Sequence, residues 1–186
     1  MTTPAPVRLR SATLDDAKAC LAIYAPYVRD TVISFEYEPP TVEEMRARIS
    51  AVLPHKPWLI ADTDSGIAGY AYANTFRARV AYQWTAEVAL YVDSSHHARG
   101  IGRRLYTALI DRLRTQGYRT IVAGISLPNP QSVGFHEALG FRKTAHFPAV
   151  GYKFGAWHDT GFWVMDLGPG SAPAPPRSAA DFEPRS

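Results

Sequence analysis

Apolar residues in the first third of the chain recur with the period of a helix. Between residues 17 and 28 they return every three to four positions. This spacing predicts a helix that Thr13 caps at its start and that Pro26 kinks or ends. A capping box that starts at Thr41 predicts a second helix directly after it. A short alternating segment at 7–11 predicts a strand before both helices.

The rest of the chain predicts strands that are separated by two further helices. Segments 58–61 and 67–73 flank the turn Asp64-Ser65-Gly66 and so predict a hairpin. The clearest helical stripe begins after Gly100 and ends at Gly117. The remaining strands are expected over 85–92, 119–125, 141–147 and 161–167, with a short helix over 132–139. This order predicts an α/β fold with a mixed central sheet flanked by helices.

The composition changes near the C-terminus. Five of the 15 prolines fall in the last 19 residues, which contain almost no apolar side chain to bury. Such a segment cannot offset the entropy of ordering. We therefore expect one folded domain over residues 1–167 and a disordered, proline-rich tail over residues 168–186.

The overall composition excludes several protein classes. The 186 residues are 46% hydrophobic and 20% charged, as in ordinary globular domains. No apolar run is long enough to span a bilayer, and no secretory signal is recognisable at the start, so we expect no membrane association. The net charge of +3 is too weak to favour a nucleic-acid partner. The single cysteine, Cys20, fits a reducing cytoplasm.

A glycine-bearing loop joins the expected strand 85–92 to the clearest helix. It reads Arg99-Gly-Ile-Gly-Arg-Arg104. The N-terminus of a helix binds anions, and Gly100 and Gly102 would let a ligand approach the backbone closely. Its three arginines oppose the helix dipole unless an anion is bound. The loop therefore predicts a polyphosphate site made of Arg99, Gly100, Ile101, Gly102, Arg103 and Arg104. The alternative is a simple turn with solvated arginines.

The same loop resembles a known family motif. The segment His97-Ala-Arg-Gly100-Ile-Gly102 is similar to the acyl-CoA pyrophosphate loop of GNAT N-acetyltransferases. Segments 81–87, 127–129, 136–141 and 155–163 resemble phosphinothricin N-acetyltransferases. The resemblance implies the GNAT acyl-CoA N-acyltransferase fold, a homodimer and acetyl-CoA as co-substrate. It also implies direct acetyl transfer, in a ternary complex, to the amine of phosphinothricin, methionine sulfoximine or methionine sulfone.

Two residues are candidates for proton transfer. Glu87 is the acidic residue of the apolar strand segment 86–92, where burial would raise its pKa and suit it to act as a general base. The resemblance implies a catalytic glutamate at this position, whereas a salt-bridged carboxylate is the structural alternative. His136 stands where many GNAT enzymes carry a tyrosine that faces the coenzyme sulfur. It would donate a proton to the thiolate or hold the acceptor, unless it is only a packed histidine.

The resemblance also implies residues that bind the acetyl donor. Backbone N–H groups of Ala89, Leu90 and Tyr91 would bind the thioester oxygen, and Asn129 would bind the pantetheine arm. Asn129 has a structural alternative as a helix cap before Pro130.

Four residues correspond to the acceptor pocket of the family. They are Phe35 as an apolar wall, Arg77 and Arg79 as carboxylate or phosphinate ligands, and Tyr82 as a hydroxyl donor. A solvated arginine pair is the alternative for Arg77 and Arg79. Family members often carry lysine and threonine where this chain has Arg77 and Ala89. Another small amine or a protein N-terminus is therefore a second candidate acceptor, and a non-catalytic acyl-CoA or nucleic-acid module is a third reading.

The histidines do not predict a metal site. His96 and His97 are adjacent, and His158-Asp159 lies far along the chain, so no pair has helical ligand spacing. We expect no metal. Trp157 and Trp163 are expected to serve the core or a dimer contact.

Overall fold

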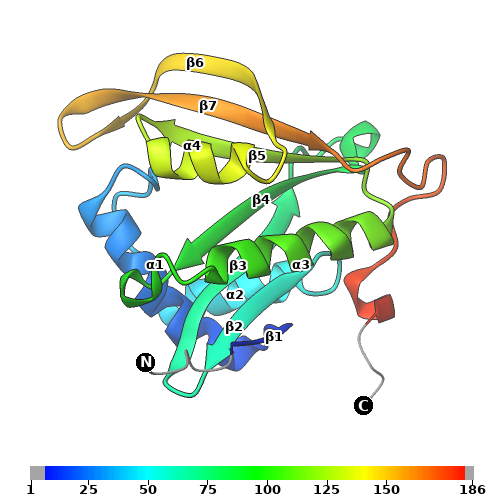
Figure 1. The fold of residues 1–186 in the computed structure, drawn as a ribbon, viewed down its shortest axis with the longest axis horizontal. Helices are drawn as coiled ribbons and strands as arrows, with labels where there is room; N and C mark the ends of the chain where they lie inside the picture. Colours follow the sequence, from blue (N-terminus) through cyan, green and yellow to red (C-terminus); the bar gives the residue numbers. More distant parts are fainter. Residues whose placement is uncertain (1–6, 183–186) are drawn as a thin grey trace.

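A seven-stranded mixed sheet forms the centre of the computed structural model, which describes residues 7–182 (Figure 1). Its strand order is β1-β2-β3-β4-β5-β7-β6. The strands are β1 (Arg8–Ser11), β2 (Trp58–Thr63), β3 (Gly66–Thr75), β4 (Thr85–Val92), β5 (Thr120–Leu127), β6 (Arg142–Lys153) and β7 (Ala156–Asp166). The helices are α1 (Ala17–Asp30), α2 (Val42–Val52), α3 (Ile101–Gln116) and α4 (Pro130–Glu137). The α/β class with a mixed sheet is thus confirmed.

The sheet opens at its middle, between β4 and β5. These strands are parallel and pair only over Thr85–Glu87, whereas β4 stays paired with β3 as far as Val92. Beyond Glu87 the two strands diverge, as Figure 1 shows. From Val88 to Tyr91 the backbone N–H and C=O groups on this edge of β4 therefore have no partner on β5 and are available to a ligand.

Helices cover both faces of the sheet because its central strands are apolar on both sides. Trp58 and Ile60 of β2 pack with the buried faces of α1 and α2, while Leu59 and Ala61 pack in the cluster that contains α3. Alternating side chains of a strand point to opposite faces, so a continuous apolar strand needs cover on each. No helix in the described part of the chain is long and apolar enough to cross a bilayer.

The helix boundaries confirm most of the local predictions. The Thr41 capping box is present, since Thr41 Oγ1 accepts from the Glu44 amide at 3.1 Å and Glu44 Oε2 accepts from the Thr41 amide at 2.6 Å. Gly117 ends α3 in the left-handed conformation, with φ of 97°. Thr13 caps a short 3-10 turn that leads into α1.

Pro26 does not end its helix. α1 continues to Asp30, so the expected end at Pro26 is wrong. Pro26 and Ala22 are exposed, so water can hydrate the Ala22 carbonyl that loses its helical partner. Beyond the proline, fully buried Val28 fastens the last turn to the core.

The C-terminal hairpin is longer than the sequence pattern predicts. β6 and β7 extend well beyond the expected segments 141–147 and 161–167 and meet at the turn Phe154-Gly155. Trp163 lies in the core, as expected, at 2% exposure. Trp157 is 65% exposed near the turn, so its side chain is not part of the core.

Residues 168–182 differ from the disordered tail that their composition predicts. Ser171 donates its amide to Gly117 O at 2.9 Å, and Trp84 Nε1 donates to Ala174 O at 2.9 Å. Ala179 is buried beside the C-terminal half of α3. Backbone hydrogen bonds to distant groups replace the missing apolar side chains, and composition alone does not reveal such bonds. Residues 183–186 of the expected tail lie outside the described residues.

Candidate active site

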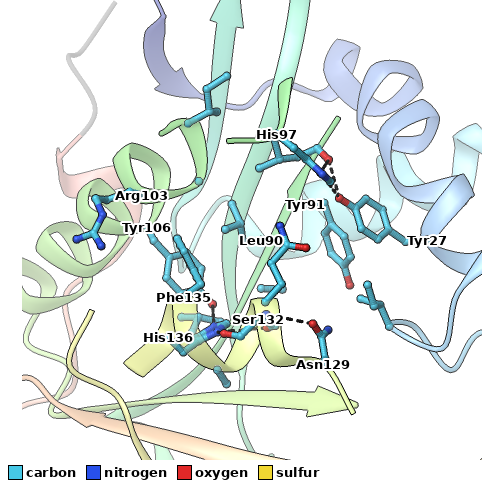
Figure 2. Close-up of a pocket in the computed structure, with 18 of the residues that line it drawn as sticks. Tyr27, Leu90, Tyr91, His97, Arg103, Tyr106, Asn129, Ser132, Phe135 and His136 are labelled. Atoms are coloured by element: carbon cyan, nitrogen blue, oxygen red, sulfur yellow. Dashed lines mark hydrogen bonds between the residues drawn. The ribbon is translucent and has the colours of Figure 1, made fainter. Parts of the chain in front are cut away.

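A cavity of about 470 Å³ lies where β4 and β5 diverge, between the N-terminal ends of α3 and α4 (Figure 2). Its position follows from the sheet, since the missing β4–β5 pairing leaves space that α3 and α4 border. The residues that line it include many of the predicted ones: Ala89, Leu90, Tyr91, Gly100, Ile101, Gly102, Arg103, Asn129 and His136. Tyr27, Ile33, Tyr106, Gly124, Ser132 and Phe135 are among the others.

The N-terminus of α3 forms one wall of the cavity. Gly100 is its N-terminal cap with φ of 75°, a conformation that favours glycine. The first helical bond joins the Arg104 amide to Gly100 O, so the amides of 101–103 have no acceptor within the helix. A Cβ on Gly102 would come within 3.1 Å of Leu90 Cδ2, which shows how closely α3 approaches β4. With no acidic residue in this first turn, the wall suits an anion.

The three predicted arginines have different surroundings. Arg103 lines the cavity at its rim, where its side chain extends outward from α3 (Figure 2). Arg104 donates from Nη2 to Val7 O at 2.7 Å, on the side of the N-terminal strand. Arg99 is exposed and is not among the lining residues. The structure therefore brings only one of these guanidinium groups to the cavity.

Asn129 caps a helix and also borders the cavity. Its side-chain Oδ1 accepts from the Ser132 amide at 3.1 Å, which caps α4 and confirms the structural alternative. Asn129 also lines the cavity (Figure 2). Since the cap uses only the oxygen, the amide nitrogen is left to donate to a ligand.

Glu87 lies beside the cavity at the point where β4 and β5 separate. Its Oε1 is 3.6 Å from the position that a Cβ on Gly124 would occupy, and Gly124 lines the cavity. Burial raises the pKa of the Glu87 carboxyl, and the charge of Arg77 opposes that rise. Within the described residues no basic side chain lies within 4.0 Å of it, so the salt-bridge alternative is not what the structure shows.

His136 is buried and uses both ring nitrogens within the protein. Nδ1 lies 2.8 Å from Ser132 O, which can only accept, so we assign the ring proton to Nδ1. Nε2 then accepts from the Tyr106 hydroxyl at 3.1 Å (Figure 2). Burial lowers the pKa of His136, and the Ser132 carbonyl opposes this. A neutral, fully bonded imidazole results, whose proton does not face the cavity.

Tyr106 is the functional candidate that the sequence analysis missed. Only 1% of it is exposed to solvent, yet it lines the cavity and holds His136. It stands four residues after Gly102 and so lies on the same face of α3. The sequence does place a tyrosine one helical turn after the glycine loop. Because it falls among the apolar positions of the helix, it looks like a core residue and not like a residue of the site.

The four predicted acceptor residues do not line the cavity. The Arg77 guanidinium lies 5.3 Å from the centre of the Phe76 ring, and the Tyr82 ring lies 6.0 Å from the same ring. Arg79 is exposed at the start of a short 3-10 turn. Phe35 packs elsewhere, against Gly151 of β6. The acceptor roles of these residues stay predictions.

Tyr27 joins α1 to the end of β4 at the far side of the cavity. Its hydroxyl donates to Val92 O at 2.6 Å and lies 3.1 Å from His97 Nε2 (Figure 2). His97 therefore belongs to the cavity rim as a hydrogen-bonded loop residue. Across residues 7–182 no group of three or more His, Cys, Asp or Glu side chains is placed to hold a metal ion.

Both sequence and fold match known proteins over most of the chain. The model of an acetyltransferase (GNAT) domain matches residues 9–162. The phosphinothricin N-acetyltransferase of Streptomyces viridochromogenes is 41% identical over 172 residues, covering 92% of each chain. The L-methionine sulfoximine/L-methionine sulfone acetyltransferase of Pseudomonas paraeruginosa is 34% identical over 163 residues, covering 87% of this chain and 95% of the relative.

A solved structure shares the fold closely. The phosphinothricin acetyltransferase of Sinorhizobium meliloti, crystallised in complex with acetyl-CoA, superimposes with a TM-score of 0.85 at 35% identity. The match covers 91% of this chain and 92% of that one.

Proposed function

Since the chain belongs to the GNAT acetyltransferase family, we propose that it moves acetyl from acetyl-CoA to the amino group of an amino-acid analogue. Phosphinothricin, methionine sulfoximine and methionine sulfone are the acceptors that the names of its relatives suggest. The observation that carries the proposal is the cavity at the β4–β5 divergence, which is bordered by a helix end suited to an anion and by Gly124, beside which the Glu87 carboxylate lies.

The residues around the cavity fit acetyl-CoA. The unpaired amides of 101–103 would bind its pyrophosphate, and the free edge of β4 would bond the amide groups of its pantetheine arm as an added strand does. Asn129 would donate to the same arm. When bound, the thioester supplies an acetyl carbon that an amine can attack.

Glu87 would take the proton from the acceptor ammonium, directly or through a water molecule. Its partial burial favours the neutral carboxyl, so the carboxylate is a stronger base than an exposed one. On the opposite wall, the Tyr106 hydroxyl would donate its one proton to His136 Nε2, so Tyr106 would offer the cavity only the lone pairs of its oxygen. This role of His136 is not the direct proton donation expected from the sequence, because the ring proton on Nδ1 is hydrogen-bonded to Ser132 O.

Measuring acetyl transfer to separate acceptors tests this function. Purified protein is mixed with acetyl-CoA and one of phosphinothricin, methionine sulfoximine or methionine sulfone, and release of the CoA thiol is followed. We expect release that depends on at least one of the three, and acetyl-CoA alone should raise the melting temperature. Turnover with peptides only would instead favour a protein N-terminus. Salt-dependent DNA binding with no response to acetyl-CoA would support a nucleic-acid module.

A second copy of the chain is the partner that we propose. Three aromatic side chains at the end of the β6–β7 hairpin are exposed, namely Tyr152 at 47%, Phe154 at 60% and Trp157 at 65%. Tyr152 and Trp157 contact each other with ring centres 5.2 Å apart. Exposed aromatic clusters of this kind are typical of protein interfaces.

Light scattering after size-exclusion chromatography tests the dimer. We expect the wild-type protein to have twice the chain mass and Trp157→Glu to shift it toward the monomer, because a carboxylate would be desolvated at the interface. Leu14→Glu, at a residue that is 37% exposed outside the hairpin, is the control and should stay dimeric. A monomeric wild type would refute the dimer, and an unchanged mass of Trp157→Glu would remove the hairpin from its interface.

The compartment that we propose is the cytoplasm. Cys20 lies on the buried face of α1, is free and fully buried, and burial raises the pKa of its thiol to about 12. A single inert thiol fits a reducing compartment.

A further inference from the structure

A charged side chain is buried at the end of β6. Lys153 is 1% exposed, and its Nζ lies within hydrogen-bond distance of three backbone carbonyls. It donates to Val28 O at 2.5 Å, to Thr31 O at 2.9 Å and to Ser34 O at 2.7 Å. An ammonium has three N–H donors, so this set of acceptors uses all of them.

The surroundings of Lys153 suit a fixed ammonium. Val28 lies in the last turn of α1, where helix carbonyls lack partners and carry partial negative charge. Glu36 is the acidic group that acts on it, but that carboxylate is already bound by Arg48 at 2.7 and 3.0 Å. Among residues 7–182, Lys153 therefore has no ion-pair partner of its own. Its ammonium binds carbonyls of the last turn of α1 and of the α1–α2 connection, and it lies 4.9 Å from the centre of the Phe154 ring.

The first part of the connection between α1 and α2, residues 31–37, is called the 31–37 segment, and among the described residues side-chain contacts hold it to β6. Besides Lys153, the Tyr37 hydroxyl donates to Tyr152 O at 2.5 Å. Phe35 fills the space over Gly151, where a Cβ would come within 2.4 Å of its ring. No strand pairing joins the segment to the sheet in the described residues. Figure 1 shows this connection beside the end of the β6–β7 hairpin.

The same segment reaches the site. Ile33 lines the cavity. Phe35, the predicted apolar wall for the acceptor, is next but one to Ile33 and packs on Gly151 outside the cavity lining. Both the side chain and the backbone of Ser34 are held in place. Ser34 Oγ forms a hydrogen bond with the Tyr24 hydroxyl at 2.7 Å, and Ser34 O accepts from Lys153. Because Ser34 lies between Ile33 and Phe35, its two hydrogen bonds help to set the positions of both neighbours.

We propose that Lys153 is a positioning residue of the acceptor site, acting by holding the 31–37 segment. The inference rests on the proposed function, because it assigns Phe35 and Ile33 to the acceptor side. Lys153 binds the 31–37 segment and not the acetyl-CoA loop of 99–104, so loss of Lys153 should change the KM for the acceptor and the KM for acetyl-CoA by different factors.

Replacement of Lys153 by methionine tests the inference through the two Michaelis constants. Lys153→Met keeps the length of the side chain and removes the three donors. We expect the KM for the amino-acid acceptor to rise by about tenfold or more, since small displacements at a site are costly, and the KM for acetyl-CoA to stay within about twofold. Lys143→Met, on the same strand, is the control, because the Lys143 ammonium only lies over the Trp163 ring at 5.5 Å.

A second variant covers the case in which Lys153→Met does not fold. Gly151→Ala leaves Lys153 in place and forces the Phe35 ring to move, because the added methyl would overlap it. The same split between the two KM values is expected. Equal changes in both constants, or no change in either, would overturn the inference.

Amide hydrogen exchange tests the role of Lys153 without depending on whether the proposed acceptors are right. In Lys153→Met, amides of the 31–37 segment should exchange faster while those of α3 keep their wild-type rates. If the wild type acetylates none of the three analogues, the proposed acceptors are wrong, and the exchange measurement still decides whether Lys153 holds the segment. Unchanged exchange in 31–37 would overturn its positioning role.

Discussion

Replacing Glu87 by glutamine is expected to lower kcat by about 10²–10⁴-fold, the usual contribution of a general base. Glutamine has nearly the same shape but cannot accept the ammonium proton. Because the carboxylate beside Gly124 is unpaired in the described part of the chain and free to accept a proton, we expect loss of Glu87 to lower turnover more than any other change that we propose. Acetyl-CoA binding, measured by calorimetry, should stay at the wild-type value because Glu87 is not part of the α3 wall.

The pH dependence of the turnover rate tests the role of Glu87 by a second measurement. Burial raises the pKa of Glu87, and the proposed base is its carboxylate. The rate should therefore fall as the pH drops through a pKa above that of an exposed glutamate, and this acidic limb should be absent in Glu87→Gln.

A matched control is Glu137→Gln, next to His136. Its Oε1 accepts from Trp163 Nε1 at 3.1 Å, a bond that glutamine can preserve. We expect wild-type turnover from this variant. Wild-type turnover from Glu87→Gln would show that another group, or bulk water, removes the proton.

Placing a carboxylate at Gly102 is expected to weaken acetyl-CoA binding by about tenfold to a hundredfold, because like charges would meet at the α3 N-terminus. Gly102→Asp puts the charge among the unpaired amides of 101–103. An acidic residue in the first helical turn interacts favourably with the helix dipole. The melting temperature without ligand should therefore not fall, which separates lost binding from lost folding.

Gly102→Ala separates charge from size. Both variants add a Cβ at 3.1 Å from Leu90 Cδ2, the flexible end of a side chain, but only aspartate adds charge. We expect alanine to weaken acetyl-CoA binding much less than aspartate does. The difference between them should shrink at high salt, as screening predicts. Equal affinities in the two variants would mean that no phosphate binds at this helix end.

Features that depend on neighbouring residues could be read from the sequence. The Thr41 cap and the Gly117 end of α3 each depend on backbone within one helical turn, so local residue types are sufficient. The glycine loop at 99–104 is contiguous as well. Its place between a strand and a helix predicted an anion-binding wall before any tertiary contact was considered.

Contacts between distant residues were decided by the tertiary structure. Pro26 was expected to kink or end α1, but the helix continues to Asp30, where burial of Val28 outweighs one lost hydrogen bond on the exposed face. Residues 168–182 were expected to be disordered, yet they bond to groups such as Trp84 that lie far along the chain. Neither outcome follows from propensity or composition, because the partners are remote in sequence.

The sequence by itself determined the α/β class, the order of most elements, the loop of 99–104 and Glu87 as the candidate base. Only the tertiary structure decided that Tyr106 is the partner of His136 Nε2, because the two residues are 30 positions apart. It alone decided that Lys153 binds the end of α1, 125 residues earlier. The physical reason is common to both: a period of two or 3.6 residues fixes which face a side chain occupies, whereas its partner across the core is set by how the elements pack.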